Sequence, residues 1–362
     1  MNKETLTYAS VCSGIEAVSV AWKDLDLKPI WFSEIEPFPC AVLSHHYPGV
    51  PNYGDMTTLP PRILSGEIEA PDILVGGTPC QAFSVAGLRK SLEDERGNLT
   101  LIFVRILNAI NIIRRKLGKP DTILLWENVP GVLSTRDNAF GCFLAALFGE
   151  SKELVPTRGR WTGAGIVRSD EFEIAWRILD AQYFGVPQRR RRVFLVAGNR
   201  DRRVAQILFE QPGEKGNPEQ GGKKGKESAA FIESSFGTYR KSDIGGTVKR
   251  TGGALSGGSE TLIVNIGATL STGFGGRDVD SDQICNGNCV IDYPKVRKLT
   301  PIECERLQGF PDNYTRISWR NKPAEQCPDT PRYMAIGNSM AVPVMQWIGK
   351  RITLKDKQKE IS

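Results

Sequence analysis

The chain of 362 residues contains only two histidines, His45 and His46, and they are adjacent. A hydrolase that pairs serine or cysteine with histidine would have to recruit one of these two. Eight cysteines are too few for a disulfide scaffold in a chain of this length. No window is apolar enough to cross a bilayer, and the N-terminus lacks the pattern of a signal peptide. These absences favour a cytoplasmic chain that has no membrane partner.

Two ligand patterns are also missing. Gly14 follows an expected strand, but the pattern G-x-G-x-x-G is absent, so no pyrophosphate cradle is expected there. Cys285 and Cys289 lack a second Cys/His pair at zinc-finger spacing, so no metal site is expected either. The net charge of +6 is compatible with a polyanion partner without requiring one.

Five apolar runs predict strands in the chain up to about Gly198. They cover residues 7–12, 29–34, 72–77, 122–127 and 191–197, and residues 99–117 have the spacing of an amphipathic helix. This alternation predicts an α/β fold with a mostly parallel sheet. Ligands gather beyond the carboxyl ends of such strands, so we expect Cys12 to Gly14, Glu34, Cys80 and Glu127 to share one site.

The composition changes after about residue 199. Residues 199–291 are rich in glycine and lysine, which predicts an exposed linker followed by short strands with glycine turns. We expect a second, loop-rich domain with a basic surface. A helix is predicted to begin after Thr300 and Pro301, and a last helical segment covers residues 339–352.

The first turn and two acids suit a nucleoside ligand. Glu34 lies twenty residues beyond Gly14, where an acid typically accepts hydrogen bonds from ribose hydroxyls. Asp55 could reach an adenine amino group of the same ligand. The alternative is a tight turn with two solvated acids.

Cys80 follows Pro79 at a bent strand end, and it could be a packed thiol, a metal ligand or a nucleophile. A nucleophile needs cationic help, which the arginine run 189–192 could supply. Strand alternation would send Arg190 and Arg192 to one face, although such a run also suits a solvated or nucleic-acid-binding surface. Glu127 could act as an acid toward a ring nitrogen, or be an N-cap or turn acid.

Eight segments in order resemble one family. They are "SVCSGIEA", "FSEIE", "YGDMT", "GGTPCQAFSVAG", "ENVPGV", "QRRRRVFLVAGN", "RKLTPIECERLQGFPD" and "AIGNSMAVPV". The chain resembles the DNA (cytosine-5) methyltransferase family, in its bacterial and phage form, over nearly its whole length.

This resemblance implies a mechanism. Cys80 would add to carbon 6 of a cytosine flipped out of duplex DNA. Glu127 would hold ring nitrogen 3 and the exocyclic amine, and Arg192 with Arg190 would orient the base and favour the thiolate. Carbon 5 would take the methyl group of S-adenosylmethionine.

The resemblance also implies binding residues. The implied cofactor contacts are Cys12, Gly14, Ile15, Glu16, Glu34, Ile35, Asp55, Met56, Pro79, Asn338 and Met340. The implied DNA contacts are Gln81, Ser84, Arg96, Thr269 and Leu270. The chain departs from the family at Cys12, at Glu16-Ala17, at Ile35 and at Ala86, where phenylalanine, glycines, an aromatic residue and serine are common.

The implied fold is a Rossmann-like, S-adenosylmethionine-dependent methyltransferase sheet with a smaller, loop-rich, mainly β target-recognition domain. Residues 1–198 and 326–362 would form the catalytic domain, with the C-terminal helix folded back onto it, and residues 199–325 the recognition domain and hinge. The expected partner is double-stranded DNA, bound by a monomer, in phage DNA protection or beside a companion restriction endonuclease. A DNA-binding relative without catalysis and a transfer-RNA methylase are the alternatives.

Overall fold

Four of the apolar runs form parallel strands that lie side by side. The computed structural model describes residues 5–79, 99–200, 204–209 and 299–354, together with the backbone of residues 355–359 and of five strands between residues 228 and 298. The parallel strands, in spatial order, are β2 (Leu27–Ser33), β1 (Leu6–Val11), β3 (Ile73–Gly76) and β4 (Ile123–Asn128). Their side chains are largely aliphatic or aromatic and mostly buried, as expected of strands covered on both faces.

Three further strands complete a seven-stranded sheet. Next to β4 lie β7 (Arg191–Asn199), β6 (Phe172–Asp180) and the edge strand β5 (Ala164–Arg168). β7 is antiparallel to β4, and β5 is antiparallel to β6. The predicted α/β fold is confirmed, whereas β5 and β6 have no counterpart among the predicted strands. β7 can run antiparallel because it follows β6 through a short connection and not through a crossover helix.

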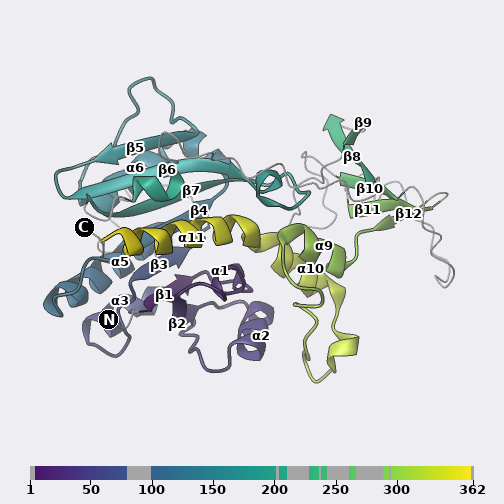
Figure 1. Ribbon diagram of the computed structural model, residues 1–362, viewed down its shortest axis with the longest axis horizontal. Coiled ribbons are helices and arrows are strands. Elements are labelled where there is room, and N and C mark those ends of the chain that lie inside the picture. The colour runs from purple at the N-terminus through teal and green to yellow at the C-terminus, as the bar shows by residue number, and fades with distance from the viewer. Residues whose placement is uncertain are drawn as a thin grey trace. The chain divides into compact units, whose positions relative to one another are not determined.

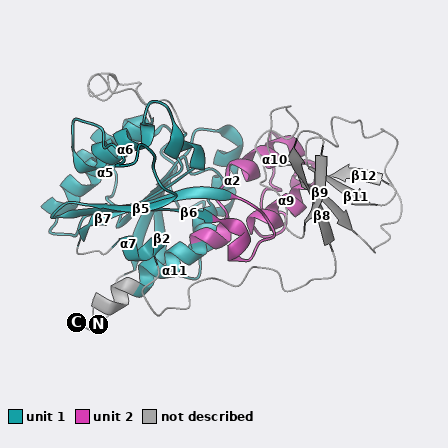
Figure 2. Ribbon diagram, turned by 90° about the horizontal axis from the view of Figure 1, so that it is seen from above, with its two compact units in different colours: residues 1–179, 191–215, 346–362 teal, residues 180–190, 216–345 magenta. Residues whose placement is uncertain are grey.

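Helices cover both faces of this sheet. Figure 2 shows α5 (Leu99–Lys116) and α6 (Ala139–Phe148) on one side of the strands, and α7 (Ala205–Leu208) and α11 (Val342–Lys359) on the other. The remaining helices of this part are α1 (Ala17–Trp22), α2 (Pro37–His46), α3 (Leu59–Leu64) and the short 3-10 turns η1 (Met56–Thr58) and η2 (Pro130–Ser134). α5 matches the predicted amphipathic helix, and its buried face packs on α3 and α6.

The C-terminal helix packs closely on the first one. A Cβ atom added to Gly349 of α11 would lie 2.3 Å from the indole nitrogen of Trp22 in α1. Arg351, two residues further along α11, donates hydrogen bonds to the carbonyls of Gln206, Ile207 and Phe209 around α7. Only glycine therefore fits at position 349, and the last helix is tied to the first part of the chain.

The chain divides into two compact units (Figure 2). Unit 1 contains residues 1–179, 191–215 and 346–362, and unit 2 contains residues 180–190 and 216–345. The functional division predicted from the sequence, with a recognition domain at residues 199–325, stays a prediction.

Unit 2 holds a second sheet and a helical part (Figure 1). The spatial order of its strands is β12 (Lys295–Lys298), β11 (Asn288–Asp292), β10 (Thr261–Asn265), β8 (Ser228–Ser235) and β9 (Thr238–Ser242). Only β10 and β11 are parallel among these pairs. The other elements are η3 (Ala181–Phe184), α9 (Pro301–Gln308), η5 (Ala324–Gln326) and α10 (Asp329–Asn338).

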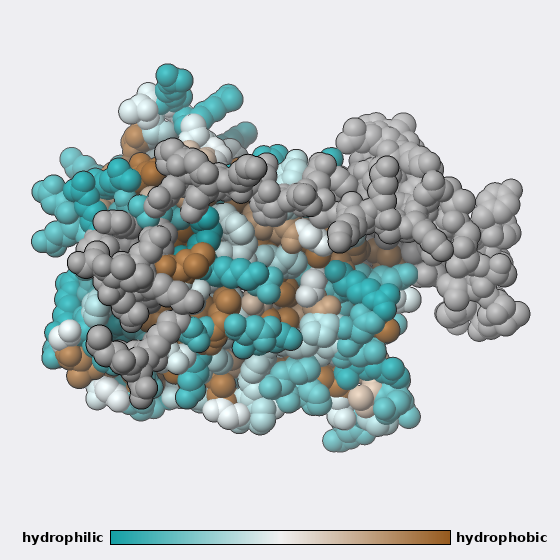
Figure 3. Space-filling view, in the orientation of Figure 1, coloured by the Kyte–Doolittle hydropathy of each residue, from teal (hydrophilic) through white to brown (hydrophobic). Residues whose placement is uncertain are grey.

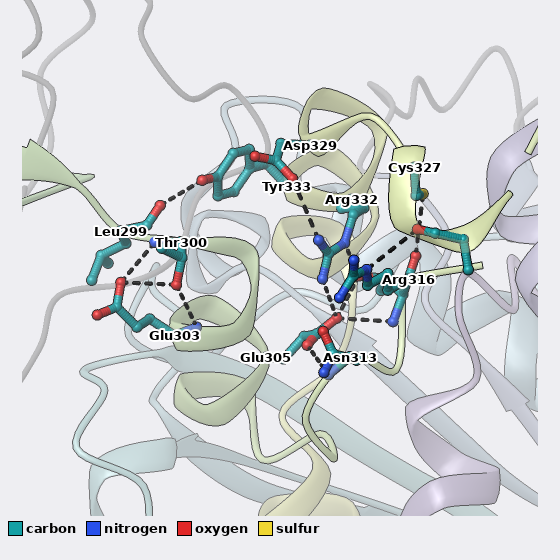
Figure 4. A network of polar contacts seen from close by, with 12 residues as sticks. Leu299, Thr300, Glu303, Glu305, Asn313, Arg316, Cys327, Asp329, Arg332 and Tyr333 are labelled. Carbon is teal, nitrogen blue, oxygen red and sulfur yellow. Dashed lines mark hydrogen bonds and ion pairs between the residues drawn. The ribbon is translucent and has the colours of Figure 1, made fainter. Parts of the chain in front are cut away.

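A buried carboxylate organises the helical part of unit 2. Thr300 caps α9 in a capping box with Glu303, so the predicted start of this helix is confirmed. Within α9, Glu305 is completely buried. Figure 4 shows its carboxylate facing Asn313 and Arg332, and it accepts hydrogen bonds from the Asn313 amide at 2.7 Å and from Arg332 Nη2 at 3.3 Å. The network fixes the loop after α9 against α10.

Candidate active site

The carboxyl ends of the four parallel strands lie in one row. Val11 pairs with Ser33 on one side and with Gly76 on the other, and Gly76 pairs with Trp126. The residues that follow these positions are therefore neighbours at one edge of the sheet. They include Cys12 to Gly14, Glu34 and Glu127, so the structure brings the described members of the predicted shared site together, and Pro79, which precedes Cys80, follows β3 at the same edge.

Glu34 ties the end of β2 to the turn after β1. Its Oε2 accepts a hydrogen bond from the Gly14 amide at 2.7 Å, and its Oε1 accepts from the amides of Ile35 and Glu36 at 2.9 and 2.8 Å. Gly14 has φ +57°, and nothing lies within 4 Å of the place where its Cβ would be. A carboxylate has about four acceptor positions, so Glu34 retains capacity for a hydroxyl donor.

Glu16 uses its side chain inside the protein. The residue is 1% exposed and adopts the left-handed conformation at the N-cap of α1. Its carboxylate accepts hydrogen bonds from the amide and hydroxyl of Ser19 and from the hydroxyl of Ser10. Burial raises its pKa. The implied cofactor contact of Glu16 stays a prediction. Because the carboxylate binds Ser10 and Ser19, the main-chain atoms of Glu16 would make this contact.

The other residues implied to bind the cofactor differ in exposure. The Cys12 thiol lies 3.8 Å from the sulfur of the buried Met56, and burial, reinforced by the Glu34 carboxylate, raises the pKa of this thiol to about 12. Ile15 is buried, whereas Ile35, two residues after the end of β2, is 68% exposed. Asp55 is exposed and caps η1 by accepting from the Thr57 amide, so it acts at least as a turn acid.

The strand end that leads to Cys80 is held by side chains that the sequence did not reveal. The buried Thr78 hydroxyl accepts a hydrogen bond from Trp126 Nε1 at 2.8 Å and lies 3.0 Å from the Thr100 hydroxyl. The Thr78 carbonyl accepts from Asn128 Nδ2 at 3.0 Å. Because Trp126 and Asn128 flank Glu127 in β4, the end of β3 is fixed relative to Glu127. Thr78 could have been noticed in the sequence because it precedes Pro79 and Cys80, whereas no sequence pattern singled out Thr100.

Glu127 and Arg192 form an ion pair at the same edge. Arg192 Nε lies 3.1 Å from Glu127 Oε1, and both side chains remain partly accessible, at 18% and 12% exposure. The two residues come from β4 and β7, which are hydrogen-bonded neighbours. A carboxylate and a guanidinium at an accessible strand end could together hold a polar heterocycle.

Arg190 has a different position. It precedes β7, so strand alternation does not determine its direction, and it is 3% exposed. Its guanidinium donates to the carbonyls of Gly337 and Ser339 at 3.1 and 2.7 Å. These carbonyls flank Asn338, and Met340 follows them. Arg190 therefore fixes the segment in unit 2 that the sequence implied for cofactor binding.

Several predicted residues lie outside the described part of the chain. They are Cys80, Gln81, Ser84, Ala86, Arg96, Thr269, Leu270 and Cys285. Among the residues that the structure does describe, no cluster of three or more histidine, cysteine or acidic side chains could hold a metal ion. Within the same residues, no helix combines the length and apolar character needed to span a membrane.

Curated relatives of this chain are methyltransferases. A protein of Escherichia phage P1 named DNA N-6-adenine-methyltransferase is 40% identical over 460 residues, which include 96% of this chain. The chain spans 61% of that relative's length. The Type II methyltransferase M.HpaII of Haemophilus parainfluenzae is 29% identical over 365 residues, covering 98% of this chain and 90% of the relative.

Solved structures and a family model agree on the fold. The Dnmt2 methyltransferase of S. pombe superposes with a TM-score of 0.56 over 97% of this chain and 99% of its own, at 16% sequence identity. A family model described as C-5 cytosine-specific DNA methylase matches residues 6–149 and 166–354. The chain therefore belongs to the C-5 cytosine-specific DNA methylase family, and the resemblance predicted from its motifs is confirmed.

Proposed function

We propose that the protein transfers a methyl group to carbon 5 of a cytosine flipped out of double-stranded DNA, with Cys80 as the nucleophile. The observation that carries this proposal is the Glu127–Arg192 pair at the mouth of the sheet, next to the strand end that leads to Cys80. Carbon 6 of a stacked cytosine is inaccessible, so the reaction requires the base to leave the duplex.

The residues around Gly14 and Glu34 fit S-adenosylmethionine as the methyl donor. The open space beside the Gly14 backbone, the residual acceptor capacity of Glu34 and the exposed side chain of Ile35 suit a turn, a ribose and an adenine ring respectively. When bound, S-adenosylmethionine supplies an activated methyl group on its sulfonium. Asn338 and Met340 are the further contacts that the resemblance implies, and Arg190 holds the neighbouring carbonyls of Gly337 and Ser339.

The chain's own residues would perform the remaining steps. The Cys80 thiolate adds to carbon 6, and the electron pair released into the ring makes carbon 5 nucleophilic. Glu127 hydrogen-bonds ring nitrogen 3 and the exocyclic amine, where charge changes during the addition, and Arg192 holds the base in plane. After methylation, loss of the proton from carbon 5 expels Cys80 and restores the aromatic ring.

The names of the relatives bear on the biological role of the methylation and on which base is methylated. The name Type II methyltransferase, carried by relatives such as M.HpaII, supports protection of DNA beside a restriction endonuclease as the setting. We further propose that this chain acts as a monomer. The name of the phage P1 relative refers to adenine N6, but this chain spans only 61% of that protein. Product analysis distinguishes the two bases.

The test is methyl transfer from labelled S-adenosylmethionine to duplex DNA, followed by hydrolysis and identification of the labelled base. We expect 5-methylcytosine from the natural chain and from a Cys327→Ala control, whose half-buried thiol lies in unit 2. Cys80→Ala should give no labelled base. Labelled N6-methyladenine alone, label in transfer RNA alone, or an active Cys80→Ala variant would each contradict the proposal.

A further inference from the structure

Residues 150–163 form a segment that belongs to this chain and not to the shared family pattern. The family model matches residues 6–149 and resumes at residue 166. The segment connects α6 to the edge strand β5, and Figure 1 shows it as a loop that rises above β5. It lies wholly within unit 1.

One side chain ties both stems of this loop. Asn138 Nδ2 donates to the carbonyl of Leu154 at 2.9 Å, and Asn138 Oδ1 accepts from Trp161 Nε1 at 2.8 Å. Asn138 occupies the N-cap position of α6 in a left-handed conformation, yet it makes no side-chain cap bond to the helix. The side-chain amide of Asn138 binds the loop and not the helix, so both ends of the loop are fixed to the start of α6.

Packing supports the same stems. A Cβ on Gly141 would lie 2.1 Å from the Leu154 carbonyl oxygen, so only glycine allows this close approach. Trp161 packs edge-to-face on Phe140 and on Trp176, with ring centroids 5.3 and 5.7 Å apart. Such aromatic contacts immobilise the indole beyond its hydrogen bond.

The tip, residues 155–160, is cationic and is exposed except at the half-buried Pro156. Its sequence Val-Pro-Thr-Arg-Gly-Arg contains no acid, and Arg158 and Arg160 are exposed and have no ion pair with any described residue. Gly159, between them, has φ +67°, and its amide donates to the Pro156 carbonyl at 3.0 Å, which closes a tight turn. Figure 3 shows mostly hydrophilic atoms where this loop rises. The tip therefore presents two arginines on a short, closed turn.

The loop leaves the sheet at the edge that holds the candidate site. Asn138 lies ten residues after the last residue of β4, at the start of α6. On the other stem, the Ile178 amide near the end of β6 donates a hydrogen bond to the Gly163 carbonyl at 2.7 Å. β6 ends beside the start of β7, because the Ala181 amide after β6 donates to the carbonyl of Arg190, the residue before β7. β5 is three strands from β4, about 14 Å at ~4.8 Å per strand. This distance equals roughly four base pairs of DNA.

We propose that the tip loop 155–160 contacts the phosphate backbone of the DNA beside the target cytosine, with Arg158 and Arg160 binding phosphates. This inference rests on the proposed function, because it requires DNA over the Glu127 edge. Phosphate contacts release counterions, so each one steepens the fall of the binding constant with salt by about 0.9 logarithmic units per decade.

The test compares two double variants in DNA-binding titrations at several salt concentrations. Arg158→Gln with Arg160→Gln removes the tip charges. Lys116→Gln with Lys119→Gln removes two exposed charges, one on the last residue of α5 and one in the connection that leads to the start of β4. We expect the tip variant to bind DNA several-fold more weakly, with a salt slope shallower by about 1.8. The control variant should keep the natural slope, and turnover at saturating DNA should remain unchanged in both.

Equal salt slopes of DNA binding for the tip variant and the natural chain would overturn the inference. A protein would then be the remaining partner for the loop. Equal changes in both variants would also overturn the inference, because net charge alone would then explain the effect. A natural chain that binds DNA but does not methylate it would refute the proposed function instead. The two failures are therefore distinguishable.

Discussion

At the scale of single residues, Thr78 shows how an ordinary side chain can fix the strand end that precedes a proposed nucleophile. Its hydroxyl meets Trp126 and Thr100, and its carbonyl meets Asn128, all in buried positions. Thr78 comes directly before Pro79 and the proposed nucleophile, and Thr100 lies in the first turn of α5. These hydrogen bonds therefore fix the end of β3, which precedes Cys80 in the chain, relative to β4 and Glu127.

Replacing Thr78 with valine keeps the shape but leaves the Trp126 N–H buried without an acceptor, which costs roughly 1–3 kcal/mol. We expect the resulting shift of the strand end to slow covalent addition by Cys80 about tenfold, the equivalent of ~1.4 kcal/mol. The binding constant for S-adenosylmethionine should stay unchanged. The measurement is the rate of covalent complex formation with DNA that contains 5-fluorocytosine at the target site.

Two comparators separate positioning from folding. Thr78→Ser keeps the hydroxyl and should restore most of the rate, whereas Thr100→Val loses only the contact between the two threonines and should have a smaller effect. A Thr78→Val variant that forms the complex at the natural rate would show that the contact with Trp126 does not position Cys80.

Asp72 provides a prediction on pH. It lies before β3, accepts from the amide and hydroxyl of Thr7, and pairs with the buried Arg114 at 2.5 Å. Burial acts to raise its pKa, but the Thr7 amide and Arg114 outweigh burial and hold the pKa below its usual value. A lowered carboxylate pKa stabilises the fold above the unfolded-state value of ~3.9, and this contribution disappears as the pH falls below it.

We therefore expect Asp72→Asn to lower the free energy of unfolding at pH 7 by roughly 2–3 kcal/mol, somewhat less than for a fully buried pair. The difference from the natural chain should shrink as the pH falls below about 4. Urea unfolding between pH 7 and pH 3 measures it, with the exposed Asp24→Asn as control. A difference that stays constant with pH would refute the electrostatic explanation.

At the scale of elements, a helix or strand was predicted correctly where its sequence pattern depends on nearby residues alone. The amphipathic pattern of α5 and the Thr300 cap of α9 are local, and both were predicted correctly. The direction of β7 depends on the preceding β6, which was not among the predicted strands. A strand whose partner is missed cannot be oriented from its own residues.

Asn138 carries the prediction at this scale. Asn138→Asp keeps the size and tolerates the left-handed conformation, but it loses the donor to the Leu154 carbonyl and places a charge beside it. We expect this loss to loosen the loop and accelerate tryptic cleavage after Arg158 or Arg160 several-fold. The exposed Asn108→Asp in α5 is the matched control. Equal cleavage rates in both variants would show that Asn138 does not fix the loop.

At the scale of the whole molecule, the motifs predicted the family, and they predicted side chains that the structure places at one edge of the sheet, but not every contact there. Glu127 and Arg192 were predicted for the site, and the structure brings them together. Arg190 was grouped with them, yet its guanidinium contacts carbonyls 147 and 149 residues further along the chain. Contacts of that separation follow from the packed fold and leave no periodic or local signal in the sequence.

The central claim is that this chain methylates cytosine through Cys80. It is tested most directly by bisulfite sequencing of DNA from cells that express the natural chain, Cys80→Ala or the Cys327→Ala control, since no target sequence has to be known beforehand. We predict 5-methylcytosine at one short recurring sequence with the natural chain and the control, and none with Cys80→Ala. The same methylation pattern with Cys80→Ala, or no 5-methylcytosine with any of the three, would contradict the account.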